Sequence, residues 1–197
     1  MNQKIILASA SPRRAELMAL AGIEFDVAAA DICEDPLSGE LPEEHVIRLA
    51  CEKARAVADR VPGRFFVGSD TVVVLDGRIM GKPADEQEAR RMLTLLSGRS
   101  HDVISGVAVL DRQNSRMISR AVTTRVNFKQ LAEKEISDYI ATGCPMDKAG
   151  AYAIQGGAIH FVRTIHGSYS NVIGLPMTEL CEMLEQIKVG EVGNVCR

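Results

Sequence analysis

The chain has 197 residues, of which 46% are hydrophobic, so it can bury a substantial core as one large domain or two small lobes. A formal net charge of -3 and a pI near 5.8 argue against a general nucleic-acid binder, which depends on a strongly basic surface. No apolar run is long enough to span a membrane, and Pro12, Arg13 and Arg14 interrupt the apolar segment that a signal peptide would need. We therefore expect a globular, cytoplasmic protein that binds neither nucleic acid nor membrane.

The segment from Lys4 to Gly22 carries the clearest structural signal. The apolar run from Ile5 to Ala8 predicts a buried strand. A helix is predicted to follow from a capping serine, a proline at the first position, an apolar stripe and a terminal glycine: Ser11, Pro12, Leu17, Leu20 and Gly22.

This strand and helix bring two hydroxyls and two arginines to a helix start. Arg13 and Arg14 fall in the first turn, where a positive charge opposes the helix dipole, so the pair makes most sense if an anion completes the site. The alternative is that both arginines are solvated surface residues, which an isolated motif would favour. Because Ser9 and Ser11 lie between strand and helix, we expect a phosphate site here.

Strand and helix signals then alternate without a low-complexity linker. We expect strands over 25–30, 65–68, 72–75, 78–80, 101–110, 117–128 and 159–162, with a hairpin turn at Asp76-Gly77 and a second turn near 113–114. We expect helices from Pro42 to about 59, from the capping pair Asp85 and Glu88 to Gly98, over 132–142, and from Pro176 with Leu180, Cys181 and Leu184 inward. Loops are expected over 31–40, 148–150 and 167–171. The pattern predicts one α/β domain over residues 1–197.

Two charged residues fall where this pattern predicts burial. Lys53 lies one heptad from Val46 on the apolar face of its helix, so its ammonium either snorkels to water or reaches inward to a phosphate. Asp70 lies between two apolar strands, so it is either a desolvated or paired carboxylate that can serve as metal ligand or base, or a turn-stabilising aspartate. Lys82 follows the hairpin and either returns a cation to the same end of the sheet or is an exposed loop lysine.

The cysteines and histidines indicate no metal centre. The five cysteines are widely spaced without a C-x-x-C pair, so we expect reduced thiols: Cys33, Cys51, Cys144, Cys181 and Cys196. The four histidines show no metal-ligand spacing, and we expect each to be structural or exposed: His45, His101, His160 and His166.

An ordered set of motifs spans nearly the whole chain. They are Ala-Ser-x-Ser-Pro-Arg-Arg at 8–14, Arg-Leu-Ala-x-Glu-Lys at 48–53, Gly-Ser-Asp-Thr-Val-Val at 68–73, Gly-Lys-Pro at 81–83, Leu-Ser-Gly at 96–98, Asp-Lys-Ala-Gly-Ala-Tyr-Ala-Ile-Gln-Gly at 147–156 and Gly-Ser-Tyr-Ser-Asn-Val-Ile-Gly-Leu-Pro at 167–176. This set resembles the Maf family of nucleoside triphosphate pyrophosphatases, also named septum-formation inhibitors. The resemblance implies a fold similar to inosine triphosphate pyrophosphatases: an elongated mixed β-sheet with flanking helices, in two lobes around a nucleotide-binding cleft.

The resemblance also implies a reaction and a site. The reaction is hydrolysis of a nucleoside triphosphate between the α- and β-phosphates, to a monophosphate and pyrophosphate, with Mg²⁺ or Mn²⁺ as the divalent metal. Asp70 matches the proton acceptor of the family, and Glu34 matches a metal-binding position. The sequence leaves open whether the two carboxylates exchange these roles, and whether Asp70 contacts water, the metal or both. The implied substrate-binding residues are two hydroxyls and four cations: Ser9, Ser11, Arg13, Arg14, Lys53 and Lys82. Cys33 departs from the acidic residues often found beside Glu34, which leaves the number of metal carboxylates open.

Three positions separate subgroups within the family. Arg13, Thr71 and Gln155 together resemble the dTTP/UTP pyrophosphatases, whereas the 7-methyl-GTP subgroup carries an aromatic residue, Gln and Glu. A neutral pyrimidine edge suits an amide that both donates and accepts, while a cationic methylated guanine suits an aromatic ring and a carboxylate. The alternative is that Gln155 is an ordinary loop amide.

Two other functions fit the same residues. One is a non-catalytic regulator of cell division that binds nucleotide in the same cleft, and the other is a house-cleaning pyrophosphatase for another modified nucleotide, such as inosine or xanthosine triphosphate. Metal-dependent release of pyrophosphate separates an enzyme from a pure binder. The sequence leaves a homodimer open as well as a monomer.

Overall fold

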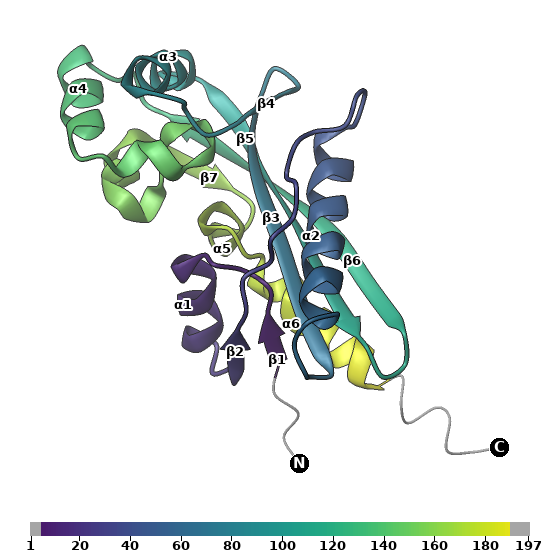
Figure 1. Cartoon of the computed structure of the whole chain (residues 1–197). Coiled ribbons are helices and arrows are strands. Elements are labelled where there is room, and N and C mark those ends of the chain that lie inside the picture. The colour runs from purple at the N-terminus through teal and green to yellow at the C-terminus, as the bar shows by residue number, and fades with distance from the viewer. Residues whose placement is uncertain (1–4, 190–197) are drawn as a thin grey trace. The chain divides into compact units, whose positions relative to one another are not determined.

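The computed structural model of this chain describes residues 5–189 and contains a seven-stranded mixed sheet with helices packed against it (Figure 1). The strands are β1 (Ile5–Leu7), β2 (Phe25–Val27), β3 (Phe65–Leu75), β4 (Arg78–Met80), β5 (Ser100–Asp111), β6 (Arg116–Phe128) and β7 (Val162–His166). The helices are α1 (Pro12–Leu20), α2 (Pro42–Ala58), α3 (Glu86–Leu96), α4 (Glu133–Ala141), α5 (Tyr169–Ile173) and α6 (Met177–Val189), with short helical turns η1 (Cys144–Asp147), η2 (Ala149–Ala151), η3 (Ile154–Ala158) and η4 (Ile159–Phe161). The expected α/β class with a mixed sheet and flanking helices is confirmed.

The sheet order is β2-β1-β3-β5-β6-β7, and β4 pairs with β3. The described residues divide into two compact units: unit 1 holds 5–70, 105–122 and 174–189, and unit 2 holds 71–104 and 123–173. Strands β3, β5 and β6 each contribute residues to both units. No helix among residues 5–189 is long and apolar enough to cross a membrane.

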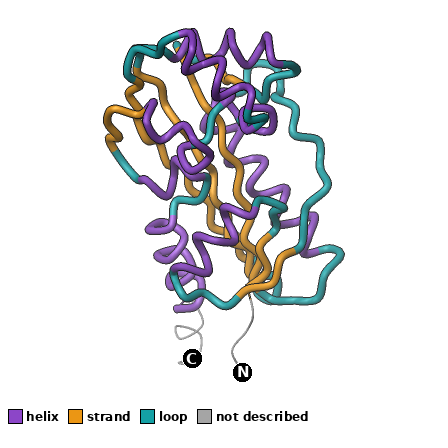
Figure 2. The backbone as a smooth tube through the Cα atoms, turned by 90° about the vertical axis from the view of Figure 1, so that its left-hand side faces the viewer, coloured by secondary structure: helices purple, strands orange, loops and turns teal. Residues whose placement is uncertain are grey.

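Unit 1 has helices on both faces of its strands, and the alternation of side chains along the strands explains why. Ile5 and Leu7 of β1 pack in one cluster with residues of α1 and α6, whereas Ile6 packs in a second cluster with residues of α2. Phe65 and Phe66 of β3 divide between the clusters in the same way. Both faces of the parallel pair β1 and β3 are therefore covered by apolar side chains, which suits their near-continuous apolar sequences. Figure 2 shows the strands in orange with the helices in purple around them.

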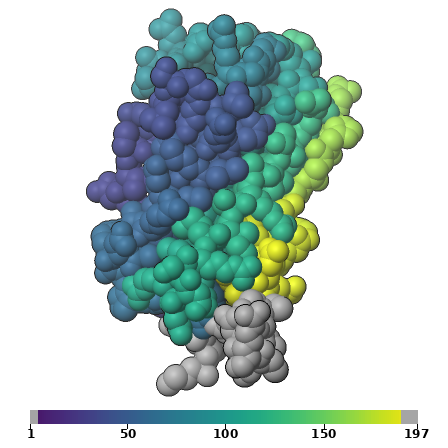
Figure 3. Space-filling model, turned by 90° about the vertical axis from the view of Figure 1, so that its right-hand side faces the viewer, coloured from purple at the N-terminus to yellow at the C-terminus, as the bar shows by residue number. Residues whose placement is uncertain are grey.

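The part of the β5–β6 hairpin that belongs to unit 1, residues 105–122, includes an ion pair with α6. Arg120 of β6 pairs with Glu182 of α6 at 2.5 Å. Figure 3 shows the surface of this hairpin between the blue surface of α2 and the yellow surface of α6.

Unit 2 packs α3, α4 and the turns over 144–161 against β3, β5 and β6 in one apolar cluster. The α3 prediction is confirmed: Asp85 Oδ1 accepts a hydrogen bond from the Glu88 backbone N–H at 2.8 Å, and Gly98 ends the segment at φ 67°. The hairpin turn is also confirmed, because Asp76 and Gly77 both have the positive φ that a tight two-residue turn requires.

Several element predictions were wrong in detail. The strands expected at 65–68 and 72–75 are one continuous strand, β3, so Asp70 lies inside a strand rather than in a turn. The expected strand near 159–162 begins only at Val162, after the helical turn η4, and the loop expected over 167–171 forms the short helix α5 from Tyr169.

In α1, the predicted stripe of Leu17 and Leu20 is wrong in part, because Leu20 is 83% exposed and Leu17 is only half-buried, whereas Met18 is the buried residue. Ser11 is at the N-cap but its side chain caps no N–H, and Gly22 lies two residues beyond the last helical residue. The strand expected over 25–30 is limited to β2. Lys4, where the first motif segment begins, lies outside the described residues.

Candidate functional site

The centre of the candidate site is an ammonium group held between two carboxylates. Lys53 of α2 places its Nζ 2.7 Å from Asp70 Oδ1 and 2.6 Å from Glu34 Oε1. Lys53 and Asp70 are only 6% and 7% exposed, whereas the Glu34 side chain is about half exposed. All three residues belong to unit 1. The inward orientation that the helix periodicity allowed for Lys53 is therefore confirmed, and so is the paired, desolvated state of Asp70.

Two glycines explain why Lys53 reaches Asp70. A Cβ at Gly68 of β3 would lie 2.0 Å from the Ala50 carbonyl oxygen, and one at Gly106 of β5 would lie 2.1 Å from that of Val46. The backbone of α2 can lie this close to the two strands only because both positions lack a side chain. Asp70 is two residues beyond Gly68 on the same face of β3, and thus lies opposite the next turn of α2, which carries Lys53.

The pair of Lys53 and Asp70 is costly to bury. Removing two charges from water costs several kcal/mol per ion, and their mutual attraction repays this only with good geometry and further hydrogen bonds. An apolar pair of similar size would stabilise the core about as well. The retained charges therefore point to a function at this position.

Arg14 ties the start of α1 to two neighbouring segments of unit 1. Its Nε donates to the Gly174 carbonyl oxygen at 2.8 Å, and its Nη1 donates to the Ser69 carbonyl oxygen at 2.8 Å and to Ser9 Oγ at 3.0 Å. Burial lowers the pKa of Arg14, and the negative charge of Asp70 opposes that shift. Arg14 thus combines a positive charge beside Asp70 with a structural role in holding the strand ends.

The hydroxyl of Ser9 is set up as a donor. Its buried oxygen accepts from Arg14 Nη1 and also from the Ser11 backbone N–H at 3.2 Å. Because a serine oxygen has two acceptor positions, its O–H hydrogen is left to donate elsewhere. Arg13 and Ser11 are half-buried at the same helix start, and within residues 5–189 the Arg13 side chain forms no hydrogen bond or ion pair.

A cluster that the sequence analysis missed holds the loop that carries Glu34. The Glu40 carboxylate accepts from Arg48 Nε at 2.5 Å and from Arg48 Nη2 at 2.8 Å, and its Oε2 lies 3.0 Å from His45 Nδ1. Arg48 Nη2 also donates to the Asp35 carbonyl oxygen at 3.1 Å. The hydrogen bonds from Arg48 are the largest cause of a strongly lowered pKa at Glu40. We call Glu40, His45 and Arg48 the loop clamp, because they fix residues next to Glu34 to α2.

Three predicted site residues belong to unit 2. Thr71 is half-buried on β3 directly after Asp70, whereas Lys82 after β4 and Gln155 in η3 are exposed. The Gly150 backbone N–H donates to the Gly81 carbonyl oxygen at 3.0 Å, so the loop at 148–151 lies beside the segment that carries Lys82. The structure therefore brings Glu34, Lys53 and Asp70 together in unit 1 and leaves Lys82 and Gln155 on the surface of unit 2.

The donor set fits a magnesium-type ion shared with a substrate. Among the described residues no group of three or more His, Cys, Asp or Glu could hold a metal alone. Glu34 and Asp70 nevertheless direct one carboxylate oxygen each at the same positively charged nitrogen. Mg²⁺ is commonly bound by one or two carboxylates together with substrate phosphates, and this pair supplies that number.

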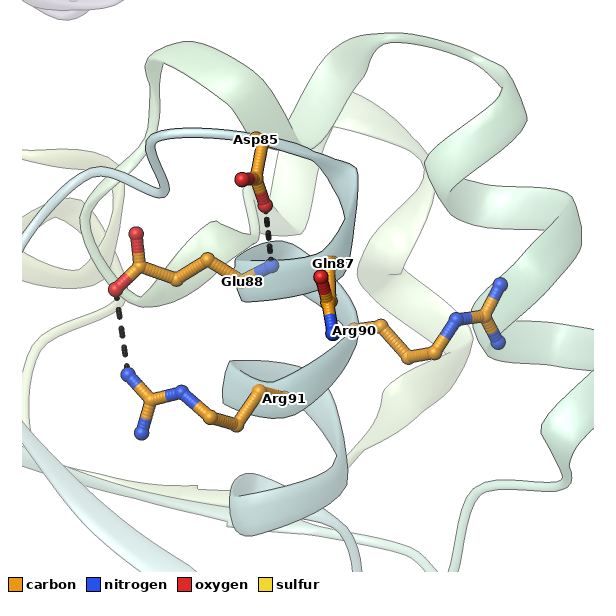
Figure 4. A pocket seen from close by; sticks show the side chains of 5 residues that line it. All are labelled: Asp85, Gln87, Glu88, Arg90 and Arg91. Carbon is orange, nitrogen blue, oxygen red and sulfur yellow. Dashed lines mark hydrogen bonds and ion pairs between the residues drawn. The ribbon is translucent and has the colours of Figure 1, made fainter.

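The remaining candidate features are a cavity on α3, the cysteines and the histidines. A cavity of about 460 Å³ lies on α3 and is lined by Asp85, Gln87, Glu88, Arg90 and Arg91. Figure 4 shows that Arg91 points to Glu88 while Arg90 points away from both, and none of the predicted site residues lines the cavity. Cys33, Cys51, Cys144 and Cys181 are free thiols, as expected, and Cys196 lies outside the described residues. His45 and His101 are buried, and His160 and His166 are exposed.

Comparison with known proteins gives a consistent result. The family model described as Maf-like protein matches residues 4–187. A dTTP/UTP pyrophosphatase of Geobacter sulfurreducens is 60% identical over 184 residues, covering 93% of this chain and 96% of the relative. One of Geobacter sp. (strain M21) is 58% identical over 98% of this chain and 99% of the relative, and one of Myxococcus xanthus is 50% identical over 92% and 91%. The resemblance in the motifs is thereby confirmed, and the chain belongs to the Maf family.

Proposed function

We propose that this protein is a nucleoside triphosphate pyrophosphatase that hydrolyses dTTP and UTP to the monophosphate and pyrophosphate. Near-full-length relatives at 58 to 60% identity are named dTTP/UTP pyrophosphatase, which supports the substrate. The observation that carries the proposal is the buried Lys53 ammonium between the Asp70 and Glu34 carboxylates. A gain in folding stability does not account for three charged groups at this position, because burying them costs about as much free energy as their attraction returns.

The phosphate-binding residues lie in unit 1. A triphosphate carries about four negative charges, so its binding site needs positive charge and hydrogen-bond donors. Arg13 offers a guanidinium without a protein partner among residues 5–189, and Ser9 offers a hydroxyl whose two acceptor positions are filled. We propose that these groups, with Ser11 and Lys53, bind phosphate oxygens, and that Arg14 adds its charge while it holds Ser9. Lys82 is proposed to bind phosphate oxygens as well.

Asp70 is the proposed general base. Its carboxylate is nearly buried and negatively charged, and one hydrogen bond from Lys53 leaves further acceptor positions for a water molecule. Asp70 would accept a proton from that water while the water oxygen attacks the α-phosphorus. The bond between the α-phosphorus and the oxygen that bridges to the β-phosphate would break, and this oxygen would leave with pyrophosphate. When bound by Glu34 and Asp70, Mg²⁺ or Mn²⁺ would supply charge neutralisation at the phosphate oxygens.

Selection of the base is proposed to depend on Arg13, Thr71 and Gln155. The pyrimidine ring of dTTP or UTP presents one N–H and two carbonyls. The Gln155 amide can donate to a carbonyl and accept from the N–H, whereas a carboxylate in its place could only accept. Gln155 is exposed, so its amide is available to a ligand.

The test is pyrophosphate release from purified protein across a panel of nucleotides, with Mg²⁺, with Mn²⁺ and with a chelator. We expect metal-dependent release from dTTP and UTP above that from inosine, xanthosine and 7-methylguanosine triphosphates. Nucleotide binding without turnover would instead support the non-catalytic regulator. Sedimentation of the same sample tests whether the enzyme is a homodimer, and fractionation of cells tests the proposed cytoplasmic location.

A further inference from the structure

Lys53 occupies a position that a metal bound by Glu34 and Asp70 would also need. Its Nζ lies within 2.7 Å of one oxygen of each carboxylate, so the ammonium fills the space between the two oxygens that a cation bound by both would occupy. We propose that Lys53 is the resident counter-ion of this site, so that the nucleotide-free protein binds a divalent metal weakly and takes it up together with the triphosphate. This inference rests on the proposed function, because it assumes that the ligand is a metal-bound triphosphate.

The charges of the three side chains support this role. Glu34 and Asp70 alone would form a site with a charge of -2, which attracts a divalent cation, and Lys53 reduces that charge to -1. A metal that entered alone would also have to displace the ammonium from its partners. Lys53 is 6% exposed, so an unpaired ammonium there would be poorly solvated and costly.

A triphosphate removes this cost. Its oxygens give the ammonium of Lys53 new anionic partners at the moment when the carboxylates of Glu34 and Asp70 gain the metal. Binding of metal and binding of nucleotide are then coupled through Lys53, since each makes the other more favourable.

The rest of unit 1 keeps the three groups close. The Gly68 contact brings the backbone of α2 onto β3, which limits how far Lys53 can move from Asp70. The loop clamp holds Asp35 next to Glu34, since Arg48 Nη2 donates to the Asp35 carbonyl oxygen. The ammonium therefore neutralises a preformed pair of carboxylates rather than two independent ones.

The experiment measures Mn²⁺ binding without nucleotide, from the electron paramagnetic resonance signal of free Mn²⁺. The substitution Lys53→Met removes the counter-ion and keeps an unbranched apolar stem. We expect this variant to bind Mn²⁺ at least about 10-fold more tightly than the wild type does. Arg55→Met is the matched control, because Arg55 lies two residues away on α2, is exposed and loses the same charge. The control should bind Mn²⁺ as the wild type does.

Two further variants keep the test decisive. Lys53→Gln also removes the charge but can still donate to Asp70, so it serves if Lys53→Met does not fold. Adding Glu34→Gln to either variant should abolish the gain, which locates the bound Mn²⁺. Binding that is unchanged or weaker in the folded Lys53 variants, or equally tighter in Arg55→Met, would overturn the proposal. Because no hydrolysis is measured, this failure is distinct from a failure of the wild type to release pyrophosphate from dTTP.

Discussion

Each unit buries a polar pair, Lys53 with Asp70 in unit 1 and His101 with Tyr152 in unit 2. In unit 2, His101 Nε2 lies 2.8 Å from the Tyr152 hydroxyl, and both rings pack edge-on against Phe128. Burial lowers the pKa of His101 to about 4 and raises that of Tyr152, so both groups are neutral at pH 7. In unit 1 the buried groups are charged and lie beside a third charge, Glu34.

The two pairs differ in charge, and we infer that they therefore differ in role. A neutral pair within an aromatic cluster fixes packing at a lower desolvation cost than a charged pair, even though His101 Nδ1 is buried without a hydrogen-bond partner among the described residues. A charged pair costs more and gives little stability in return, but it offers charge to a ligand. Changes to the first pair should therefore alter stability, and changes to the second should alter turnover.

The largest expected effect is on turnover, from Asp70→Asn. An amide keeps the shape of the side chain and can still accept from Lys53, but it loses the basicity and the negative charge. We expect a loss of about 10²–10⁴-fold in the rate of dTTP hydrolysis. The control is Asp102→Asn, which removes a carboxylate paired with Arg125 in unit 2 and should leave turnover unchanged. Equal losses in both variants would remove Asp70 from the mechanism.

The second effect concerns His101 and pH. Its pKa is about 4 in the folded chain and 6.5 in the unfolded chain. As the pH falls, the unfolded chain therefore takes up the imidazole proton at a higher pH than the folded chain does, and this favours unfolding. The stabilisation from neutral His101 is complete above pH 6.5, declines as the pH falls toward 4, and amounts to roughly 3 kcal/mol over that range. His101→Gln should flatten this part of the curve of unfolding free energy against pH, measured by urea denaturation, and should preserve turnover at pH 7.5. An unchanged slope would show that another group titrates there.

A smaller effect, on selectivity, is expected from Gln155→Glu. A carboxylate cannot donate to a pyrimidine carbonyl and leaves it unpaired, which costs about 1–3 kcal/mol or roughly 5- to 150-fold in kcat/KM for dTTP and UTP. Hydrolysis of 7-methyl-GTP should fall less, because the new carboxylate attracts its cationic ring. Gln87→Glu on α3 is the exposed control. Equal losses for every nucleotide would assign Gln155 to support of its loop.

The smallest effect is expected in the loop clamp. Arg48→Lys keeps the charge but cannot contact both Glu40 oxygens and the Asp35 carbonyl in the same geometry. Glu34 should then be held less firmly, so the Mg²⁺ concentration for half-maximal turnover should rise about 5-fold, equivalent to about 1 kcal/mol, while kcat at saturating Mg²⁺ stays near normal. Titrating Mg²⁺ in parallel with Arg55→Lys checks this. A lower kcat with an unchanged Mg²⁺ requirement would contradict a positioning role.

The burial of residues that lie in a strong local pattern could be predicted from the sequence. The heptad spacing from Val46 placed Lys53 on the inner face of α2, and the apolar neighbours of Asp70 predicted its burial. The break predicted at Ser69-Asp70-Thr71 was wrong because local propensity cannot register that Lys53, 17 residues away, neutralises Asp70 and allows the strand to continue.

Other features depend on contacts that no regular spacing of residues in the sequence indicates. Arg14 fits the sequence pattern of a phosphate ligand, but its Nε is held by Gly174, 160 residues away in the chain. The pairing of Glu40 with Arg48 joins a turn-rich loop to a helix. Arg48 opens the motif at 48–53, but nothing in the sequence pattern indicates that Glu40 is its partner. Such pairs follow from the tertiary packing of α2 and its preceding loop rather than from periodicity.

The most direct test of the division between the two buried pairs measures turnover and stability together. Pyrophosphate release from dTTP and the urea midpoint should be determined side by side for the wild type, Asp70→Asn and His101→Gln. We predict that Asp70→Asn loses at least about 100-fold in turnover while it remains folded, and that His101→Gln loses stability but keeps near-normal turnover. Near-normal turnover in folded Asp70→Asn would contradict the assignment of catalysis to the charged pair of unit 1.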